Sequence, residues 1–374
     1  MGRVSNVLLA VLFLAPGNAG RATPFFARQL NLACASCHSG FPRLNAFGVA
    51  FKANNFRLPG DPAKTPPIWR KTIPLAVQVK PTWLMLSPGS LRVQFTETQI
   101  LAGGSVGPRT AFYMHDGRYL DAKPQPFPTW ELWVQQVVDD RSRLMVKAGQ
   151  FELPLGYSPE INKTTISYPI ILFSSNLVSN DVALGGAVSG LQLSGRTGAG
   201  LTWYAEAGAP AATQSGNPVG DRVFFGRFRD FFGRVAMGDP GRNLGAFIYL
   251  FSPEPRTGGG SDSHGLRAGL DGNLFWKGNQ FQGMWIYGES TRPSTSRGTL
   301  RGGFIEADRM VLPWFGITAR LDVQSSSAPG IAHYLDAKTL TVRFYPVQHV
   351  KLAAEAQSLD HGARTFSLQA ALTY

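Results

Sequence analysis

The sequence predicts an all-β transmembrane barrel of about 16 antiparallel strands, preceded by a small N-terminal segment of mostly helical or irregular structure. Three observations lead to this fold class. The chain begins like an exported protein, yet no later stretch reaches the roughly 18 consecutive apolar residues of a membrane helix. From residue 73 onward, segments of about ten residues alternate between apolar and polar. Short turns between these segments alternate with long loops rich in Gly, Ser and Pro, as in bacterial barrels.

Residues 1–22 are predicted to be a secretory signal peptide. Met1-Gly2-Arg3 supplies the charged start, the run from Val4 to Ala15 is apolar, and small residues up to Ala22 offer cleavage sites. The formal net charge of the chain is +12. Because these charges are scattered through an exported chain without a basic patch, we expect no nucleic-acid partner.

A cysteine pair and a histidine form the one strong chemical motif of the chain. Cys34-Ala35-Ser36-Cys37-His38 is the C-x-x-C-H pattern of c-type haem attachment. Two thiols at this spacing reach the two vinyl groups of the porphyrin, and the histidine then lies under the iron as an axial ligand. A zinc half-site would need further Cys or His ligands, which residues 20–75 lack, and a redox dithiol would need a thioredoxin-like context. The predicted cofactor is therefore one covalent haem c on Cys34, Cys37 and His38, with His38 as the iron ligand.

The second axial position of the haem iron has no obvious occupant. No Met and no other His lies between His38 and the first predicted strand. The candidates are Met85, Met114, His115, Met145 or a later histidine, and an open site with bound water is an alternative. The sequence does not choose among them.

The residues around the motif also carry a family resemblance. Pro24-Phe25-Phe26-Ala27-Arg28-Gln29 precedes the motif, and Phe41-Pro42, Leu44-Asn45, Phe47-Gly48 and Phe51-Lys52 follow it. Over these fifty or so residues the chain resembles the fused cytochrome-porins of the outer membrane of iron-oxidising bacteria. The resemblance implies a single haem at the start of the mature chain, a porin-like barrel behind it, and ferrous iron as the electron donor.

The chain then divides into a signal peptide (1–22), a monohaem cytochrome c segment (23–60), a Pro-rich linker (61–72) and an outer-membrane barrel (73–374). A cytochrome segment this short needs support beyond its own core. We expect it to plug the barrel lumen, with four aromatic side chains covering the haem: Phe41, Phe47, Phe51 and Phe56.

The predicted barrel consists of sixteen strands. Their expected residues are 73–86, 91–102, 110–117, 129–138, 143–153, 184–194, 201–208, 223–237, 244–252, 266–276, 280–288, 300–310, 314–324, 334–345, 349–358 and 364–374. Alternation alone does not distinguish lipid-facing from core-facing apolar residues, since a soluble sandwich also alternates. The last strand, with its apolar face ending on Tyr374, resembles the signal read by the outer-membrane assembly machinery. Aromatics near strand ends suit interfacial girdles: Trp83, Trp130, Tyr249, Trp276, Trp285 and Trp314.

The longest predicted loop, Pro154 to Val182, is expected to fold into the lumen and narrow it. Three inward-facing arginines, Arg227, Arg320 and Arg343, are candidates for anion selection. No carboxylate cluster at metal-ligand spacing is evident, so ferrous iron as donor follows from the resemblance alone.

The expected function is electron transfer through the haem across the outer membrane. The partners are an extracellular reductant, expected to be ferrous iron, a periplasmic c-type cytochrome as acceptor, and outer-membrane lipid. If the protein is an enzyme, its activity is that of a ferrous iron:cytochrome c oxidoreductase. The alternative is a porin whose haem plug acts as a redox-gated channel or sensor. A peroxidase would need an open distal site and catalytic distal groups, which the sequence does not identify.

Overall fold

The fold was analysed in a computed structural model, which describes residues 25–58, 73–86, 91–118, 129–140, 143–158, 162–173, 184–210, 229–239, 241–252, 264–292, 295–328, 331–347 and 349–373. The predicted signal peptide, the whole of the predicted linker (61–72), Arg227 and Tyr374 lie outside these residues. None of the helices in the described ranges is long and apolar enough to cross a membrane.

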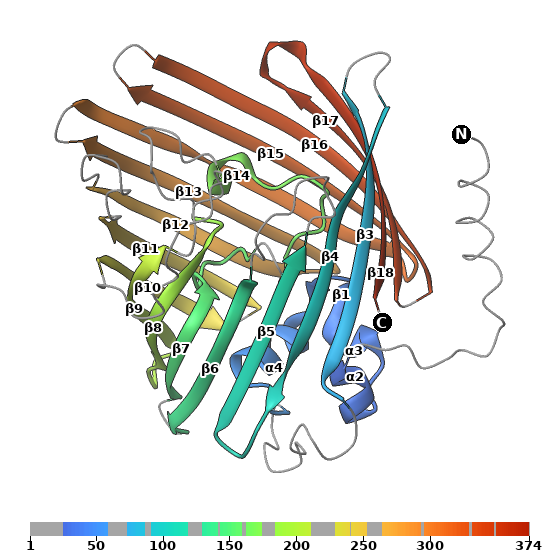
Figure 1. Cartoon of the computed structure of the whole chain (residues 1–374), viewed down its shortest axis with the longest axis vertical. Coiled ribbons are helices and arrows are strands. Elements are labelled where there is room, and N and C mark those ends of the chain that lie inside the picture. Colours follow the sequence, from blue (N-terminus) through green and yellow to red (C-terminus); the bar gives the residue numbers. More distant parts are fainter. Residues whose placement is uncertain are drawn as a thin grey trace.

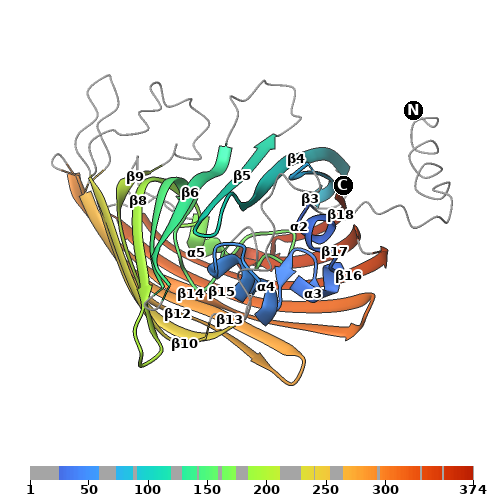
Figure 2. The same ribbon diagram turned by 90° about the horizontal axis from the view of Figure 1, so that it is seen from below.

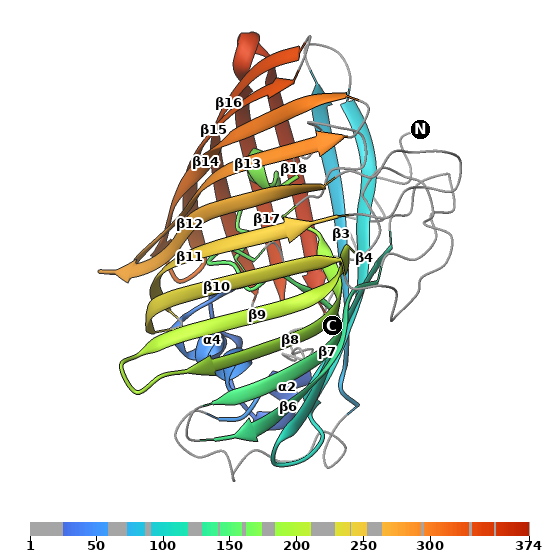
Figure 3. The same cartoon turned by 90° about the vertical axis from the view of Figure 1, so that its left-hand side faces the viewer.

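Sixteen antiparallel strands form a closed barrel (Figures 1 and 3). They are β3 Leu75–Leu86, β4 Leu91–Ser105, β5 Thr110–Arg118, β6 Thr129–Asp139, β7 Leu144–Glu152, β8 Ala187–Arg196, β9 Leu201–Pro210, β10 Asp230–Asp239, β11 Arg242–Phe251, β12 His264–Trp276, β13 Asn279–Arg292, β14 Thr295–Leu312, β15 Phe315–Ala328, β16 Ile331–Val347, β17 Val350–Leu359 and β18 Arg364–Thr373. Each pairs with its neighbours in sequence order. The last strand closes the ring on the first, with Leu368 opposite Trp83. Each of the sixteen predicted strands has an observed counterpart, and the ends differ by at most seven residues. The first part of the strand predicted at 223–237, residues 223–228, lies outside the described residues.

Along the strands, polar side chains face the lumen of the barrel and apolar side chains face its outer surface. On β15, Arg320 is 1% exposed and its neighbour Leu321 is 49% exposed. The same pattern places Lys351 and Glu355 of β17 inside and Leu352 outside. A soluble sandwich would bury the apolar face, so the outward apolar surface settles that ambiguity in favour of a membrane barrel.

Side-chain exposure agrees with only part of the aromatic prediction, and the side chain of Trp130 lies outside the described part of the structure. Trp276, Trp285 and Trp314 are each about half exposed on the outer surface. Tyr249 was predicted as an interfacial residue, and this is wrong: its ring is 1% exposed, and its hydroxyl donates a hydrogen bond to Asp230. Its position in the inward-facing register of β11 sends the ring into the lumen.

The N-terminal segment lies within the ring of strands (Figure 2). It contains α2 Phe25–Leu30, α3 Cys34–Cys37, the short hairpin of β1 His38–Gly40 and β2 Arg43–Leu44, and α4 Ala46–Ala53. Phe25, Phe51 and Phe56 pack in one apolar cluster with inward side chains of β3, β5, β6 and β7, among them Tyr113 and Trp133. The predicted lumen plug is therefore the observed arrangement of residues 25–58.

The plug lies toward the end of the barrel that carries the short turns. Asn55 donates to the carbonyl of Arg109 in the β4–β5 turn at 3.1 Å. Arg57 pairs at 2.9 Å with Asp140 in the β6–β7 turn. The strand β3 starts at this same end, so the plug and the barrel begin on one side of the membrane.

The loop after β7 also enters the lumen, as predicted. Its short helix α5 Ile170–Phe173 contacts β14 and β15. Leu153, Tyr157 and Leu172 form a buried apolar cluster with inward residues of β8, β10, β11, β13 and β14. Porin lumens are usually polar and wet, whereas this side of the lumen contains a packed core.

Candidate functional site

The motif cysteines occupy the one-turn helix α3, and its position is set by the start of α4. The Asn45 side chain accepts a hydrogen bond from the Gly48 amide at 2.9 Å and so caps α4. The Asn45 amide group also donates to the carbonyls of Ala35 and Ser36 at 3.1 Å. One side chain thereby joins the cap of α4 to the interior of the C-x-x-C turn.

Glycine is required at position 48 because the two helices meet there. A Cβ atom on Gly48 would lie 2.2 Å from the carbonyl oxygen of Cys37. A side chain at position 48 would therefore clash with the Cys37 backbone, and relieving the clash would require α3 to move relative to α4. The close approach keeps His38 directly beside the capped helix.

His38 is held in one ring orientation. Its Nδ1 donates a hydrogen bond to the carbonyl oxygen of Pro42 at 2.9 Å. Histidines that bind metals commonly donate their other ring nitrogen to such an acceptor, which fixes the tautomer. Loss of solvent around the ring lowers the pKa of His38 to about 4, although hydrogen bonds to Pro42 and Arg43 oppose the shift. The imidazole is therefore neutral at physiological pH, with the Nε2 lone pair available to a metal.

The two thiols lack the lowered pKa of a reactive redox dithiol. Both cysteines are free and partly buried. Desolvation, with a smaller contribution from Cys34, raises the pKa of Cys37 to about 11, and desolvation also raises the pKa of Cys34. Reactive redox dithiols have lowered thiol pKa values. This opposite shift argues against the redox-dithiol alternative.

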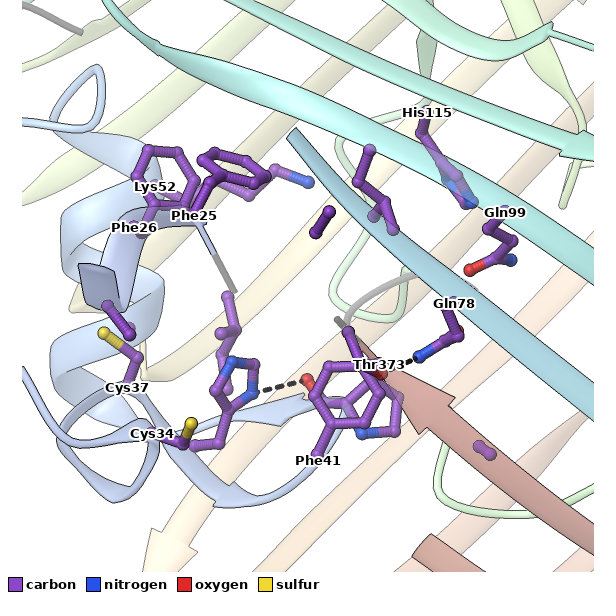
Figure 4. Close-up of a pocket in the computed structure, with 18 of the residues that line it drawn as sticks. Phe25, Phe26, Cys34, Cys37, Phe41, Lys52, Gln78, Gln99, His115 and Thr373 are labelled. Carbon is purple, nitrogen blue, oxygen red and sulfur yellow. Dashed lines mark hydrogen bonds between the residues drawn. The ribbon is translucent and has the colours of Figure 1, made fainter. Parts of the chain in front are cut away.

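All three motif side chains line a single cavity between the plug and the barrel wall (Figure 4). The cavity contains about 1590 Å³ of space, including its open mouth. Five phenylalanines of the plug line it: Phe25, Phe26, Phe41, Phe51 and Phe56. Phe47 was predicted to cover the haem and does not line the cavity; it packs against Phe51 with ring centroids 6.5 Å apart. Phe25 and Phe26 precede the motif and were missed, although they form part of the family resemblance.

The residues of this cavity suit a haem. The donor set is a neutral imidazole with two thiols beside it. The phenylalanines supply an apolar lining for the ring faces, and four lysines line the same space: Lys52, Lys80, Lys163 and Lys351. Sequence reasoning missed these lysines because three of them come from distant strands or the lumen loop.

The four named candidates for the second axial ligand lie in different places. His115 of β5 is 4% exposed and lines the cavity. Met85 is 44% exposed, and Met114 alternates with His115 and so faces the other side of the wall. The sulfur of Met145 accepts a hydrogen bond from Gln135 at 3.2 Å. None of the three methionines lines the cavity.

Buried ion pairs fasten the plug to the wall. Arg43 pairs with Glu306 and with Asp308 of β14, the latter at 3.1 Å, and all three side chains are almost fully buried. Arg43 also donates to the carbonyl of Asn162 in the lumen loop at 3.1 Å. Two residues earlier, the Phe41 carbonyl accepts a hydrogen bond from Tyr345 of β16 at 3.0 Å. The Pro42 carbonyl that orients His38 therefore lies between two contacts with the barrel.

Two of the three arginines proposed for anion selection, Arg320 and Arg343, lie in the described residues and are paired with carboxylates. Arg320 pairs with Asp322 at 2.7 Å and binds Thr165, Ser167 and Tyr168 of the lumen loop. Arg343 pairs with Asp308. Both guanidinium groups face inward as predicted, but their charge holds the loop and the wall together instead of lining an open pore.

Within the described residues, no group of three or more His, Cys, Asp or Glu side chains is arranged to hold a metal ion.

No family model and no curated protein matches the chain. Several solved structures share its fold. The trimeric form of OmpT from Vibrio cholerae matches with a TM-score of 0.59 and 10% identity, over 81% of this chain and 99% of the other. An anion-selective porin from Comamonas acidovorans matches with a TM-score of 0.60 and 10% identity, over 80% and 98%. The channel DcaP of Acinetobacter baumannii matches with a TM-score of 0.58 and 10% identity, over 80% and 96%.

These likenesses concern the fold, since the identities are low. They extend over nearly the whole length of each porin. The chain is thus a closed sixteen-stranded barrel of the outer-membrane porin type, and the predicted location in the bacterial outer membrane is confirmed at the level of this fold.

Proposed function

We propose that this protein carries electrons across the outer membrane through one c-type haem bound covalently at Cys34, Cys37 and His38. The observation that carries the proposal is that these three side chains line one cavity inside the barrel, with His38 oriented by the Pro42 carbonyl. A bound haem supplies one-electron chemistry in a layer of roughly 30 Å that soluble carriers do not cross.

The residues of the chain have separate roles in this proposal. Cys34 and Cys37 would hold the porphyrin through two thioether bonds, each formed by addition of an S–H group across a vinyl double bond, and His38 would ligate the iron. The phenylalanines exclude water from the ring faces, and the ion pairs of Arg43 keep the assembly in place.

The proposed donor is extracellular ferrous iron and the proposed acceptor is a periplasmic c-type cytochrome. Ferrous iron comes from the family resemblance, while the filled lumen supports electron conduction over bulk solute flow. In this reaction one electron leaves ferrous iron, which becomes ferric iron, and the acceptor cytochrome is reduced by one electron.

Stopped-flow visible spectroscopy tests this proposal. The full-length protein is produced with haem maturation machinery, purified in detergent, oxidised, and mixed with ferrous iron. The expected result is rapid appearance of a reduced c-haem spectrum. Covalent haem that dithionite reduces but ferrous iron does not would overturn iron as donor, and absence of covalent haem would overturn the whole proposal.

A solute channel is the second candidate, because the barrel shares its fold with porins. In that case the plug gates the pore in response to haem oxidation state. Planar-bilayer recordings of the oxidised and reduced protein separate the two functions. A conductance that changes with haem oxidation state would favour the gated channel, and a negligible conductance in both states would favour the conduit.

A further inference from the structure

The cavity that contains the haem motif has two chemically different ends. The plug contributes the cysteines, His38 and the phenylalanines. The barrel wall contributes polar groups: Gln78 and Lys80 of β3, Gln99 of β4, His115 of β5, Lys351 of β17 and Thr373 of β18. Figure 4 shows Gln78, Gln99, His115 and Thr373 across the cavity from Cys34 and Cys37.

The polar end of the cavity consists mostly of buried side chains on the barrel strands. Gln78, Gln99, His115, Lys351 and Thr373 are each at most 5% exposed. Gln78 donates a hydrogen bond to Thr373 at 2.8 Å and so joins the first barrel strand to the last beside the cavity. The side chains of this group face one common space.

The charged side chains that line the cavity are mostly positive. Four lysines line it, Lys52, Lys80, Lys163 and Lys351, whereas Glu152 is the one carboxylate among the lining residues. Lys52 lies 3.8 Å from Glu131, and the Lys163 ammonium lies over the Tyr168 ring. Lys80 and Lys351 come from strands on the wall side, where the buried glutamines gather. A ligand with negative charge at that end would complement the cavity.

We propose that Lys80 and Lys351, together with Gln78 and Gln99, bind the two propionate carboxylates of the haem. This inference rests on the haem assignment of the proposed function. In protoporphyrin the vinyl groups and the propionates lie at opposite edges of the ring. Because Cys34 and Cys37 hold the vinyl edge against the plug, the propionate edge points to the opposite end of the cavity. Ammonium and amide donors there make charge-assisted hydrogen bonds to the carboxylates.

The test compares a dicarboxylate ligand with its neutral ester. The full-length chain is produced without haem maturation machinery and titrated in detergent with ferric protoporphyrin IX and, separately, with its dimethyl ester. Lys351→Gln and Lys80→Gln are each expected to weaken binding of the free acid by roughly tenfold and to leave ester binding unchanged. Lys351→Arg, which keeps the charge, is expected to retain most of the affinity.

Lys338→Gln is the matched control, since Lys338 is an exposed lysine of β16 that does not line the cavity. It should bind both ligands like the unmodified chain. The inference is overturned if the cavity variants weaken acid and ester equally, or weaken neither. It is also overturned if succinate binds as tightly as the porphyrin and loses affinity in the same variants, because the lysines would then serve free anions. These titrations do not involve electron transfer, so their outcome is separate from the iron-reduction experiment.

Discussion

Replacing Arg43 by methionine is expected to loosen the plug while leaving the barrel intact. Arg43 is fully buried, and its guanidinium pairs with Glu306 and Asp308 and donates to the Asn162 carbonyl. Methionine fills similar volume but provides no charge and no donor. The substitution therefore removes one link that joins the plug, the wall and the lumen loop.

The expected cost follows from what remains around the two carboxylates. Removing one partner of a buried ion pair usually costs about 3–5 kcal/mol. After the substitution, Glu306 still pairs with Arg320 at 3.7 Å and still accepts a hydrogen bond from Gln282 at 2.8 Å. Asp308 still pairs with Arg343 and accepts a hydrogen bond from Thr318. We therefore expect the free-energy cost of Arg43→Met to lie at the lower end of this range, about 3 kcal/mol. This cost corresponds to about a 140-fold rise in the population of molecules whose plug is released.

Arg57→Met is the matched comparison. Arg57 also ties the plug to the barrel, but its partner Asp140 has a side chain that is 46% exposed. Such a partly exposed pair stabilises the docked plug by about 1 kcal/mol or less, so Arg57→Met should raise the population with the plug released by about fivefold at most.

Hydrogen exchange measured by mass spectrometry on peptides covering α4 checks this difference, with peptides of β12 and β13 as internal references. Equal loss of α4 protection in the two variants would refute the reasoning. Parallel loss in the reference strands would show that the whole barrel, and not the plug, depends on Arg43.

Three further predictions concern the haem motif and the lumen loop. Gly48→Ala should lower covalent haem content severalfold, because its Cβ would lie 2.2 Å from the Cys37 carbonyl; Gly107→Ala, with open space around it, should leave haem content unchanged on haem-stained gels. Cys34→Ala combined with Cys37→Ala should abolish haem that survives denaturation, and retained staining would contradict the proposed attachment. Arg320→Met removes donors to three loop residues, so trypsin should cut the lumen loop faster than in the unmodified chain; unchanged cleavage would mean that the other loop contacts suffice.

Much of the barrel was predictable because strand patterning is a local property. Period-two alternation and turn-forming residues mark each strand, and every predicted segment pairs with its expected neighbours. The direction of the alternation was not predictable from the pattern alone. Only the closed ring shows that Leu321 faces outward while Arg320 faces the lumen.

The candidate site was predictable only where its residues are close in the chain. Cys34, Cys37 and His38 lie within five residues, and their spacing alone indicates haem attachment. The partner of the His38 ring, the Pro42 carbonyl, is nearby as well, but only the turned hairpin brings its oxygen to Nδ1.

The sequence by itself predicted about sixteen strands in sequential order, the haem motif and a plug in the lumen. Tertiary structure alone decided what surrounds that motif. Lys351 follows Cys34 by more than three hundred residues, and barrel closure through β18 and β3 brings its strand to the same cavity. Asp322 and Asp308 likewise pair with Arg320 and Arg343, so two of the arginines that the sequence offered for anion selection form internal ion pairs. Local patterns specify elements, whereas contacts between distant strands depend on how the ring closes.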